Sequence, residues 1–162
     1  MPTDDDILIR PMRAAEIPAL CRLLRTCYEH VGRRESLTRG QIDWIVEHRA
    51  AESCVRTESR EQHYLVATGD EGGRSAIVGI AAIRADEITR LYVAPDRHGC
   101  GIGRLLFAAA EELIRQSGHE RLVLGTMPGT VGFYESMGAE VEGTKPYRAE
   151  VLADRELSLI HI

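Results

Sequence analysis

Three alternate glycines, Gly99, Gly101 and Gly103, constrain this sequence more than any other feature. They follow the short apolar segment 91–93 and open a stretch in which apolar residues recur at helical spacing. Glycine lets backbone N–H groups approach a bulky anion closely, and a helix N-terminus adds about half a positive charge there. Arg104 would lie in the first helical turn, where a cation is unfavourable unless an anion is nearby. The pattern predicts a strand–loop–helix unit that holds a phosphate group.

Two other glycine-rich patterns also place phosphates at a helix N-terminus. The dinucleotide-binding pattern is G-x-G-x-x-G near the start of a β-α-β unit, whereas this loop reads G-x-G-x-G and lies past the middle of the chain. Leu106 stands where the third glycine would fall. The P-loop pattern requires Gly-Lys-Ser/Thr, which does not follow. Dinucleotide binding is therefore the weaker alternative, and a turn in which the glycines serve only backbone geometry stays open.

Apolar periodicity predicts an α+β domain. The expected order is a strand, two helices, three strands, a helix, a strand, a helix and two strands. Strands grouped in the middle of the chain favour a mixed sheet over a parallel doubly wound one. The 162 residues fit one domain, residues 1–162, with a single core. The strands are expected near 7–9, 64–68, 76–83, 88–93, 121–124, 139–147 and 155–162, and the helices at 14–28, from Thr38 to about Ala51, from the glycine loop to Gly118 and at 130–137.

Composition and charge argue against several classes of protein. A net charge of −5 and few aromatic residues argue against a nucleic-acid-binding surface. The longest apolar run, 77–83, is far shorter than the roughly 20 residues that span a bilayer. The acidic start at Asp4, Asp5 and Asp6 differs from a basic secretory leader, so a cytoplasmic location is expected. No metal site is expected from the four dispersed cysteines, which are interpreted as reduced thiols: Cys21, Cys27, Cys54 and Cys100.

Two motifs resemble the GNAT superfamily of acyl-CoA-dependent N-acyltransferases. In that family a strand that often reads Leu-Tyr-Val-x-Pro precedes Arg/Gln-x-x-Gly-x-Gly/Ala, and here residues 91–95 read Leu-Tyr-Val-Ala-Pro before His98-Gly99-Cys100-Gly101-Ile102-Gly103. The second landmark, an aromatic–Tyr pair followed by a glycine, corresponds to Phe133-Tyr134 and Gly138. The order of elements also fits, so the resemblance covers nearly the whole chain. It implies a three-layer fold with a mixed sheet of about seven strands flanked by about four helices.

The resemblance implies acetyl-CoA as co-substrate and assigns residues to it. The pantetheine arm would lie along the backbone of Leu91, Tyr92 and Val93, and the phosphates at His98, Gly99, Cys100, Gly101, Ile102, Gly103 and Arg104. Two positions depart from the family pattern. His98 replaces the leading Arg/Gln, so this contact either becomes weaker and pH-dependent or points to solvent, since a free His titrates near 6.5. Met127 stands where the family often has an Asn.

The resemblance also suggests two catalytic residues for transfer to an amine. Tyr134 matches the tyrosine that often protonates the leaving sulfur, although a half-buried core aromatic is the alternative. Glu87 stands four residues before Leu91, a position that some members use for the base. Alternation along a strand would put Glu87 and Leu91 on one face, and a solvated carboxylate is the alternative. No metal takes part in this scheme.

The sequence leaves several alternatives for the amine acceptor and for the oligomeric state. The acceptor is expected to be a primary amine of a small molecule or peptide. Basic residues of the expected acceptor loops suggest one with a carboxylate, the overall negative charge suggests a polyamine or aminoglycoside, and a solvated surface is the third reading: Arg33, Arg34, Lys145, Arg148 and Arg155. The departures at His98 and Met127 motivate a different class, an acyl-CoA-binding sensor or scaffold without turnover. The apolar final strand, 157–160, is a candidate homodimer interface.

Overall fold

The computed structural model describes residues 6–146 and 156–161, which form a seven-stranded sheet in the order β1-β2-β3-β4-β5-β7-β6. Only the β4–β5 pair is parallel, so the mixed sheet and the α+β class are confirmed. The strands are β1 (Leu8–Pro11), β2 (His63–Glu71), β3 (Arg74–Arg84), β4 (Glu87–Val93), β5 (Val123–Thr126), β6 (Glu140–Pro146) and β7 (Glu156–His161). The helices are α1 (Ile17–Arg34), α2 (Arg39–Arg49), α3 (Glu52–Glu58), α4 (Ile102–Gln116) and α5 (Val131–Glu135), with short 3₁₀ turns η2 (Ala14–Glu16), η3 (Pro95–Arg97) and η4 (Pro128–Thr130).

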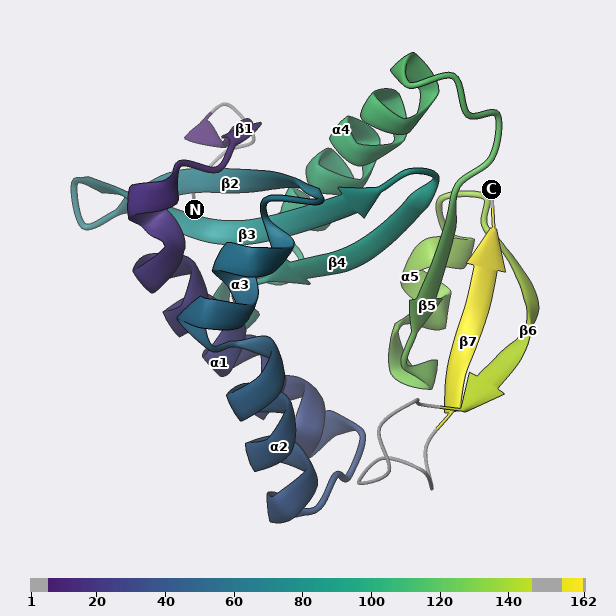
Figure 1. The fold of residues 1–162 in the computed structure, drawn as a ribbon, viewed down its shortest axis with the longest axis horizontal. Coiled ribbons are helices and arrows are strands. Elements are labelled where there is room, and N and C mark those ends of the chain that lie inside the picture. Colours follow the sequence, from purple (N-terminus) through teal and green to yellow (C-terminus); the bar gives the residue numbers. More distant parts are fainter. Residues whose placement is uncertain (1–5, 147–155, 162) are drawn as a thin grey trace.

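Helices cover both faces of the sheet and give three layers (Figure 1). The core divides into two apolar clusters, and neighbouring residues of β3 belong to different ones: Ile80 to the first and Ala81 to the second. The first cluster contains residues of α1, α2 and α3, and the second contains residues of α4 and α5. Because side chains of a strand alternate between faces, the two clusters lie on opposite sides of the sheet.

Local signals placed several element ends correctly. Thr38 caps α2, and its hydroxyl accepts from the Gln41 N–H at 3.1 Å while Gln41 bonds back to the Thr38 N–H. Gly118 follows α4 with φ +91°, as expected of a glycine just past a helix end. The hairpin turn between β2 and β3 uses Gly72 and Gly73, both at positive φ.

The first helix, predicted to end at residue 28, is six residues longer. Helix α1 continues through Gly32 and ends at Arg34. Gly32 lies where α1 crosses α2, and a Cβ there would be 2.4 Å from Cγ1 of Ile42. The glycine therefore serves close helix packing and does not end the helix. The separate helix α3 was not expected either.

Strands β4 and β5 meet at one end and then diverge (Figure 1). Their pairing is confined to Glu87 and Val123, where the Val123 N–H also donates to the Asp86 carbonyl at 2.9 Å. A bulge interrupts β4 beyond that point, because Arg90 pairs with Ala82 and Ile88 with Ile83, leaving Thr89 unmatched. The split between the two strands becomes the candidate site.

The bulge corrects the expected alternation along β4. Ile88 packs in the same cluster as Leu91 and Val93, so the side-chain faces shift by one residue at Thr89. Glu87 therefore does not share the face of Leu91, contrary to the sequence-based expectation.

The final strand is not a sheet edge. Strand β7 pairs with β5 on one side and β6 on the other, so its two edges are already hydrogen-bonded and the argument for an interface at an open apolar edge was wrong. Strand β6 forms the outer edge. Tyr147, Arg148, Arg155 and Ile162, which the sequence assigned to closing strands or a basic rim, lie outside the described residues, as do Asp4 and Asp5. Over the described ranges no helix is both long and apolar enough to cross a membrane.

Candidate active site

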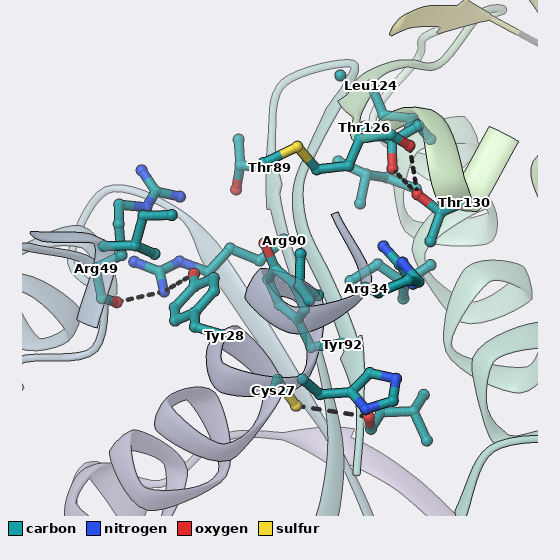
Figure 2. A pocket seen from close by; sticks show the side chains of 18 of the residues that line it. Cys27, Tyr28, Arg34, Arg49, Thr89, Arg90, Tyr92, Leu124, Thr126 and Thr130 are labelled. Atoms are coloured by element: carbon teal, nitrogen blue, oxygen red, sulfur yellow. Dashed lines mark hydrogen bonds between the residues drawn. The ribbon is translucent and has the colours of Figure 1, made fainter. Parts of the chain in front are cut away.

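The split between β4 and β5 contains a pocket of about 400 Å³ (Figure 2). Residues of α1 and α2 line it on one side, and those of β5, η4 and α5 line it on the other. Figure 2 shows Tyr28 and Arg90 across from Thr126 and Thr130. The pocket therefore joins two parts of the sheet that are hydrogen-bonded to each other only at the closed end of the split.

The edge of β4 that faces the pocket has no neighbouring strand beyond its first residue. The Ala94 N–H donates to the Val78 carbonyl of β3 at 2.8 Å, so the backbone groups of Leu91 and Val93 point the other way, toward the split. Leu91 and Val93 also line the pocket. An extended ligand can pair with this edge as an added strand would.

The glycine loop ends beside the same strand and has the geometry of an anion cradle. Gly99 and Gly101 both have φ of +82°, a conformation that glycine adopts without steric cost, and Gly101 caps α4. Gly103 makes a close approach instead, since a Cβ there would lie 3.0 Å from Cζ of Phe133. No acceptor among the described residues pairs with the N–H groups of residues 99–104. These donors and the helix dipole can bind a phosphate together.

Side chains of the loop are engaged within the protein. His98 Nε2 lies 2.9 Å from the Val93 carbonyl oxygen, which Cys27 Sγ also approaches at 3.5 Å. Arg97 donates to the Asp70 carbonyl at 2.6 Å, and Arg104 donates to the Ser136 hydroxyl at 3.0 Å. His98 is exposed, but its ring bonds back to the strand and lines the pocket. The backbone remains the part of the loop that is available to a phosphate.

Tyr134 is buried and lines the pocket from α5. Its ring packs against Phe107 and Phe133, with centroids 6.0 and 5.0 Å away. Burial raises the pKa of the phenol, which keeps it protonated at neutral pH. A protonated phenol is thus held at the split beside the free edge of β4.

Glu87 does not join Tyr134 at the pocket. Its carboxylate forms an ion pair with Arg84 at 3.0 Å and does not line the cavity. The residue lies at the closed end of the split, where β4 still pairs with β5. The structure brings Leu91, Val93, His98 and Tyr134 to one pocket and leaves Glu87 beside it.

A buried charged group under the pocket was missed by the sequence reading. Arg90 is 2% exposed and binds both oxygens of Glu58, at 3.1 and 2.9 Å. It also donates to the Tyr28 hydroxyl at 3.2 Å and to the Arg49 carbonyl at 2.6 Å (Figure 2). An arginine in the interior of a strand was the available signal, but its partners are 32 to 62 positions away. Arg90 ties α1, α2 and α3 to the strand that lines the pocket.

His30 was also missed, because it lies beyond residue 28, where the first helix was predicted to end. It lines the pocket from the last turns of α1, and its ring meets that of His98 edge-on at 5.2 Å. Partial burial, together with the charges of His98, Arg34 and Arg33, lowers the pKa of His30 below 6.5. The imidazole is therefore neutral at pH 7.

The split in the sheet, the free strand edge and the anion cradle together suit an extended ligand that carries a phosphate. The chain belongs to the acetyltransferase (GNAT) domain family, whose model matches residues 34–152, and it is an acetyltransferase. The resemblance stated from the sequence is thereby confirmed.

Several solved structures share this fold. A GCN5-related N-acetyltransferase from Rhodopseudomonas palustris has a TM-score of 0.85 at 18% identity, over 99% of this chain and 97% of that one. PaiA N-acetyltransferase from Thermoplasma acidophilum, in complex with coenzyme A, has a TM-score of 0.69 at 19% identity, over 96% and 97%. Ribosomal-protein-alanine N-acetyltransferase from Brucella melitensis has a TM-score of 0.67 at 23% identity, over 96% and 98%. None of the curated proteins matches the sequence.

Proposed function

We propose that this enzyme transfers the acetyl group of acetyl-CoA directly to a primary amine of a small molecule or peptide, with Tyr134 as general acid. The observation that carries the proposal is a buried, protonated phenol at the split, next to the free edge of β4. The family membership and the coenzyme A complex of the PaiA relative support acetyl-CoA as the donor.

The chain offers a separate surface for each part of the donor. The N–H groups of residues 99–104 suit the pyrophosphate, and the free edge of β4 at Leu91 and Val93 suits the amide groups of the pantetheine arm. His98 would have to leave the Val93 carbonyl, or share it, when that arm pairs with β4. The cost is small, because one exposed hydrogen bond is exchanged for another.

In the proposed reaction the amine nitrogen bonds to the thioester carbonyl carbon and the carbon–sulfur bond breaks. Tyr134 gives its phenolic proton to the departing sulfur, which leaves as a thiol. The N–H of Leu91 or Val93 stabilises the negative charge that develops on the thioester oxygen. The nitrogen must also lose a proton, which requires a base at the pocket.

For that base the geometry favours His30 over Glu87. His30 lines the pocket and is neutral at pH 7, whereas Glu87 is paired with Arg84 and lies outside the lining. In this scheme His30 accepts the proton from the nitrogen, and exchange with water returns one to Tyr134.

The first test is Tyr134→Phe, with Tyr64→Phe as the matched control. Tyr64 is also a buried tyrosine but does not line this pocket. Loss of a general acid is expected to lower kcat by about 100-fold while the Kd of acetyl-CoA stays the same. Tyr64→Phe should keep the wild-type kcat. Unchanged turnover in Tyr134→Phe would remove Tyr134 from the mechanism.

A pH profile distinguishes the two candidate bases. In the wild type kcat/KM is expected to fall below pH 6.5 as His30 becomes protonated, because its pKa is lowered from that value. His30→Gln should abolish this acid limb and lower the plateau, whereas Glu87→Gln should preserve both. The opposite pattern would assign the base to Glu87.

A binding measurement separates the enzyme from a module that holds acyl-CoA without turnover. Acetyl-CoA at 100 times its Kd should stabilise the fold by about 2.7 kcal/mol, a shift of several degrees in Tm, and NAD at equal concentration should not. Binding without thiol release in the presence of any amine of a broad panel would favour the non-catalytic module.

A further inference from the structure

The wall of the β4–β5 pocket is basic although the chain is acidic. Arg34, Arg49, Arg90 and Lys145 line the pocket, and no Asp or Glu of the described residues does. The whole chain has a net charge of −5. A wall of this sign attracts an anionic group and repels a polycation.

Two of these four cations already have partners. Arg90 is fully engaged with Glu58, Tyr28 and the Arg49 carbonyl. Arg34 Nε lies 3.2 Å from Glu35, whose carboxylate also accepts from the Gly129 N–H at 3.0 Å. These contacts hold the walls of the pocket together. They leave Arg49 and Lys145 as the cations that can act on a ligand.

Arg49 is the better placed of the two. It is the last residue of α2; its backbone carbonyl accepts from Arg90, and its side chain forms no hydrogen bond with another described residue. Its half-buried guanidinium lies in the pocket beside Tyr28 and Arg90, with no acidic side chain bonded to it among the described residues (Figure 2). The charge of Glu58 acts on this guanidinium without forming an ion pair with it, so the planar fork of Arg49 is open to a carboxylate.

The phosphates proposed for the donor do not explain Arg49. Helix α2 packs on the sheet face covered by α1 through Ile42 and Ile45, whereas α4, with the glycine loop at its start, packs on the opposite face through Ile102 and Leu106. The cradle for the phosphates and the Arg49 side chain therefore reach the split from opposite faces. Arg49 lies on the side that remains for the acceptor.

The residues around Arg49 indicate the size and polarity of the ligand that fits there. Trp44 and Ile45, about one helical turn earlier on α2, also line the pocket, and the Trp44 ring is held by stacking on His48 at 4.2 Å. An apolar or aromatic group can pack there while a charged group reaches Arg49.

We infer that the acceptor is an amine that also carries a carboxylate, of the size of a free amino acid with an apolar side chain, and that Arg49 binds this carboxylate. The inference rests on the proposed acetyl transfer and names its substrate class. It excludes polyamines, because the described wall offers them no acidic partner.

The kinetic test compares L-amino acids with the corresponding L-amino acid amides and with spermidine at saturating acetyl-CoA. The free acids should have the higher kcat/KM. Arg49→Met should lower this value roughly 10–100-fold for the acids, as expected for loss of a charge-assisted bond, and leave it unchanged for the amides. Arg39→Met is the matched control, since Arg39 lies on the same helix and is 59% exposed in surface ion pairs.

The outcomes separate this inference from the proposed function. If the wild type acetylates amides or spermidine as well as the acids, or if Arg49→Met affects acids and amides alike, the carboxylate site is wrong and acetyl transfer stands. Calorimetry with coenzyme A present gives a readout without turnover, with N-acetyl-L-amino acids and their amides as probes. Acid-selective binding that Arg49→Met abolishes would support the carboxylate site even if no amine were acetylated, and its absence would overturn the site.

Discussion

At the scale of single residues, the Arg90–Glu58 pair decides whether the pocket keeps its shape. The Arg90 side chain is fully buried and that of Glu58 is 14% exposed. Their contact joins α3 to β4, and Arg90 also bonds to residues of α1 and α2. A buried guanidinium that lost its carboxylate would keep its desolvation cost without the compensating attraction.

Glu58→Gln is therefore expected to destabilise the fold by about 3 kcal/mol. For a chain of this length that lowers Tm by roughly 6–12 °C. Replacing both partners, as in Arg90→Met with Glu58→Met, should recover most of the loss because no charge stays buried alone. Urea unfolding of the three proteins measures this. A double variant no more stable than Glu58→Gln would contradict the explanation.

The same pair predicts how stability depends on pH. Burial alone raises the pKa of Glu58, but the hydrogen bonds and charge of Arg90 outweigh it and hold the pKa below its usual 4.5. A carboxyl with a lowered pKa in the folded state stabilises the fold fully above the unfolded pKa, and this contribution is lost as pH falls through the folded one. The free energy of unfolding should thus fall less steeply below pH 4.5 in Glu58→Gln than in the wild type. Equal slopes would mean that the pair is not linked to acid unfolding.

At the scale of elements, the crossing of α1 and α2 sets the wall of the pocket that we propose for the acceptor. Gly32 allows the two helices to approach, and the crossing positions His30 on α1 and Trp44 on α2. The positions of His30 and Trp44 in the pocket wall therefore depend on Gly32 having no side chain.

Gly32→Ala tests this packing against Gly40→Ala, a second helical glycine. A Cβ at Gly32 would be 2.4 Å from Cγ1 of Ile42, so the variant is expected to lose about 1–3 kcal/mol of stability. At Gly40 the nearest atom is 4.0 Å away, and alanine should stabilise α2 by about 0.5–1 kcal/mol. Thermal unfolding of both variants measures the difference. A stable Gly32→Ala protein with unchanged kinetics would mean that the helices can separate without affecting the site.

At the scale of the whole molecule, the split sheet is what makes a site. Strands β4 and β5 pair with each other only at Glu87 and Val123, and past this pair they border the pocket. The donor would contact the free edge of β4 and the glycine loop at once, and would thereby occupy the gap in the sheet.

Hydrogen exchange can detect a donor that binds in the gap between β4 and β5. Acetyl-CoA is expected to slow exchange of the N–H groups of Leu91 and Val93 and of residues 99–104, because each gains an acceptor. The centre of β3, already paired on both sides, should change little. Protection confined to the glycine loop would mean that the pantetheine arm does not add to β4.

Much of the local structure followed from the sequence. The start of α2 at Thr38, the Gly118 helix end and the glycine loop were all predicted, because each depends on residues within a few positions of one another. The motif around Tyr134 also led to a residue that lines the pocket.

Tertiary structure decided the rest. The length of α1 depends on the contact of Gly32 with Ile42, and the bulge at Thr89, which separates Glu87 from the face of Leu91, arises from pairing with β3. Arg90 with Glu58, and the position of Arg49 in the pocket, depend on side chains brought together from distant elements. Periodicity and capping act over one or two turns, so the sequence by itself determined most of the elements, their order and the glycine loop. The charges that line the pocket were decided only by how those elements pack.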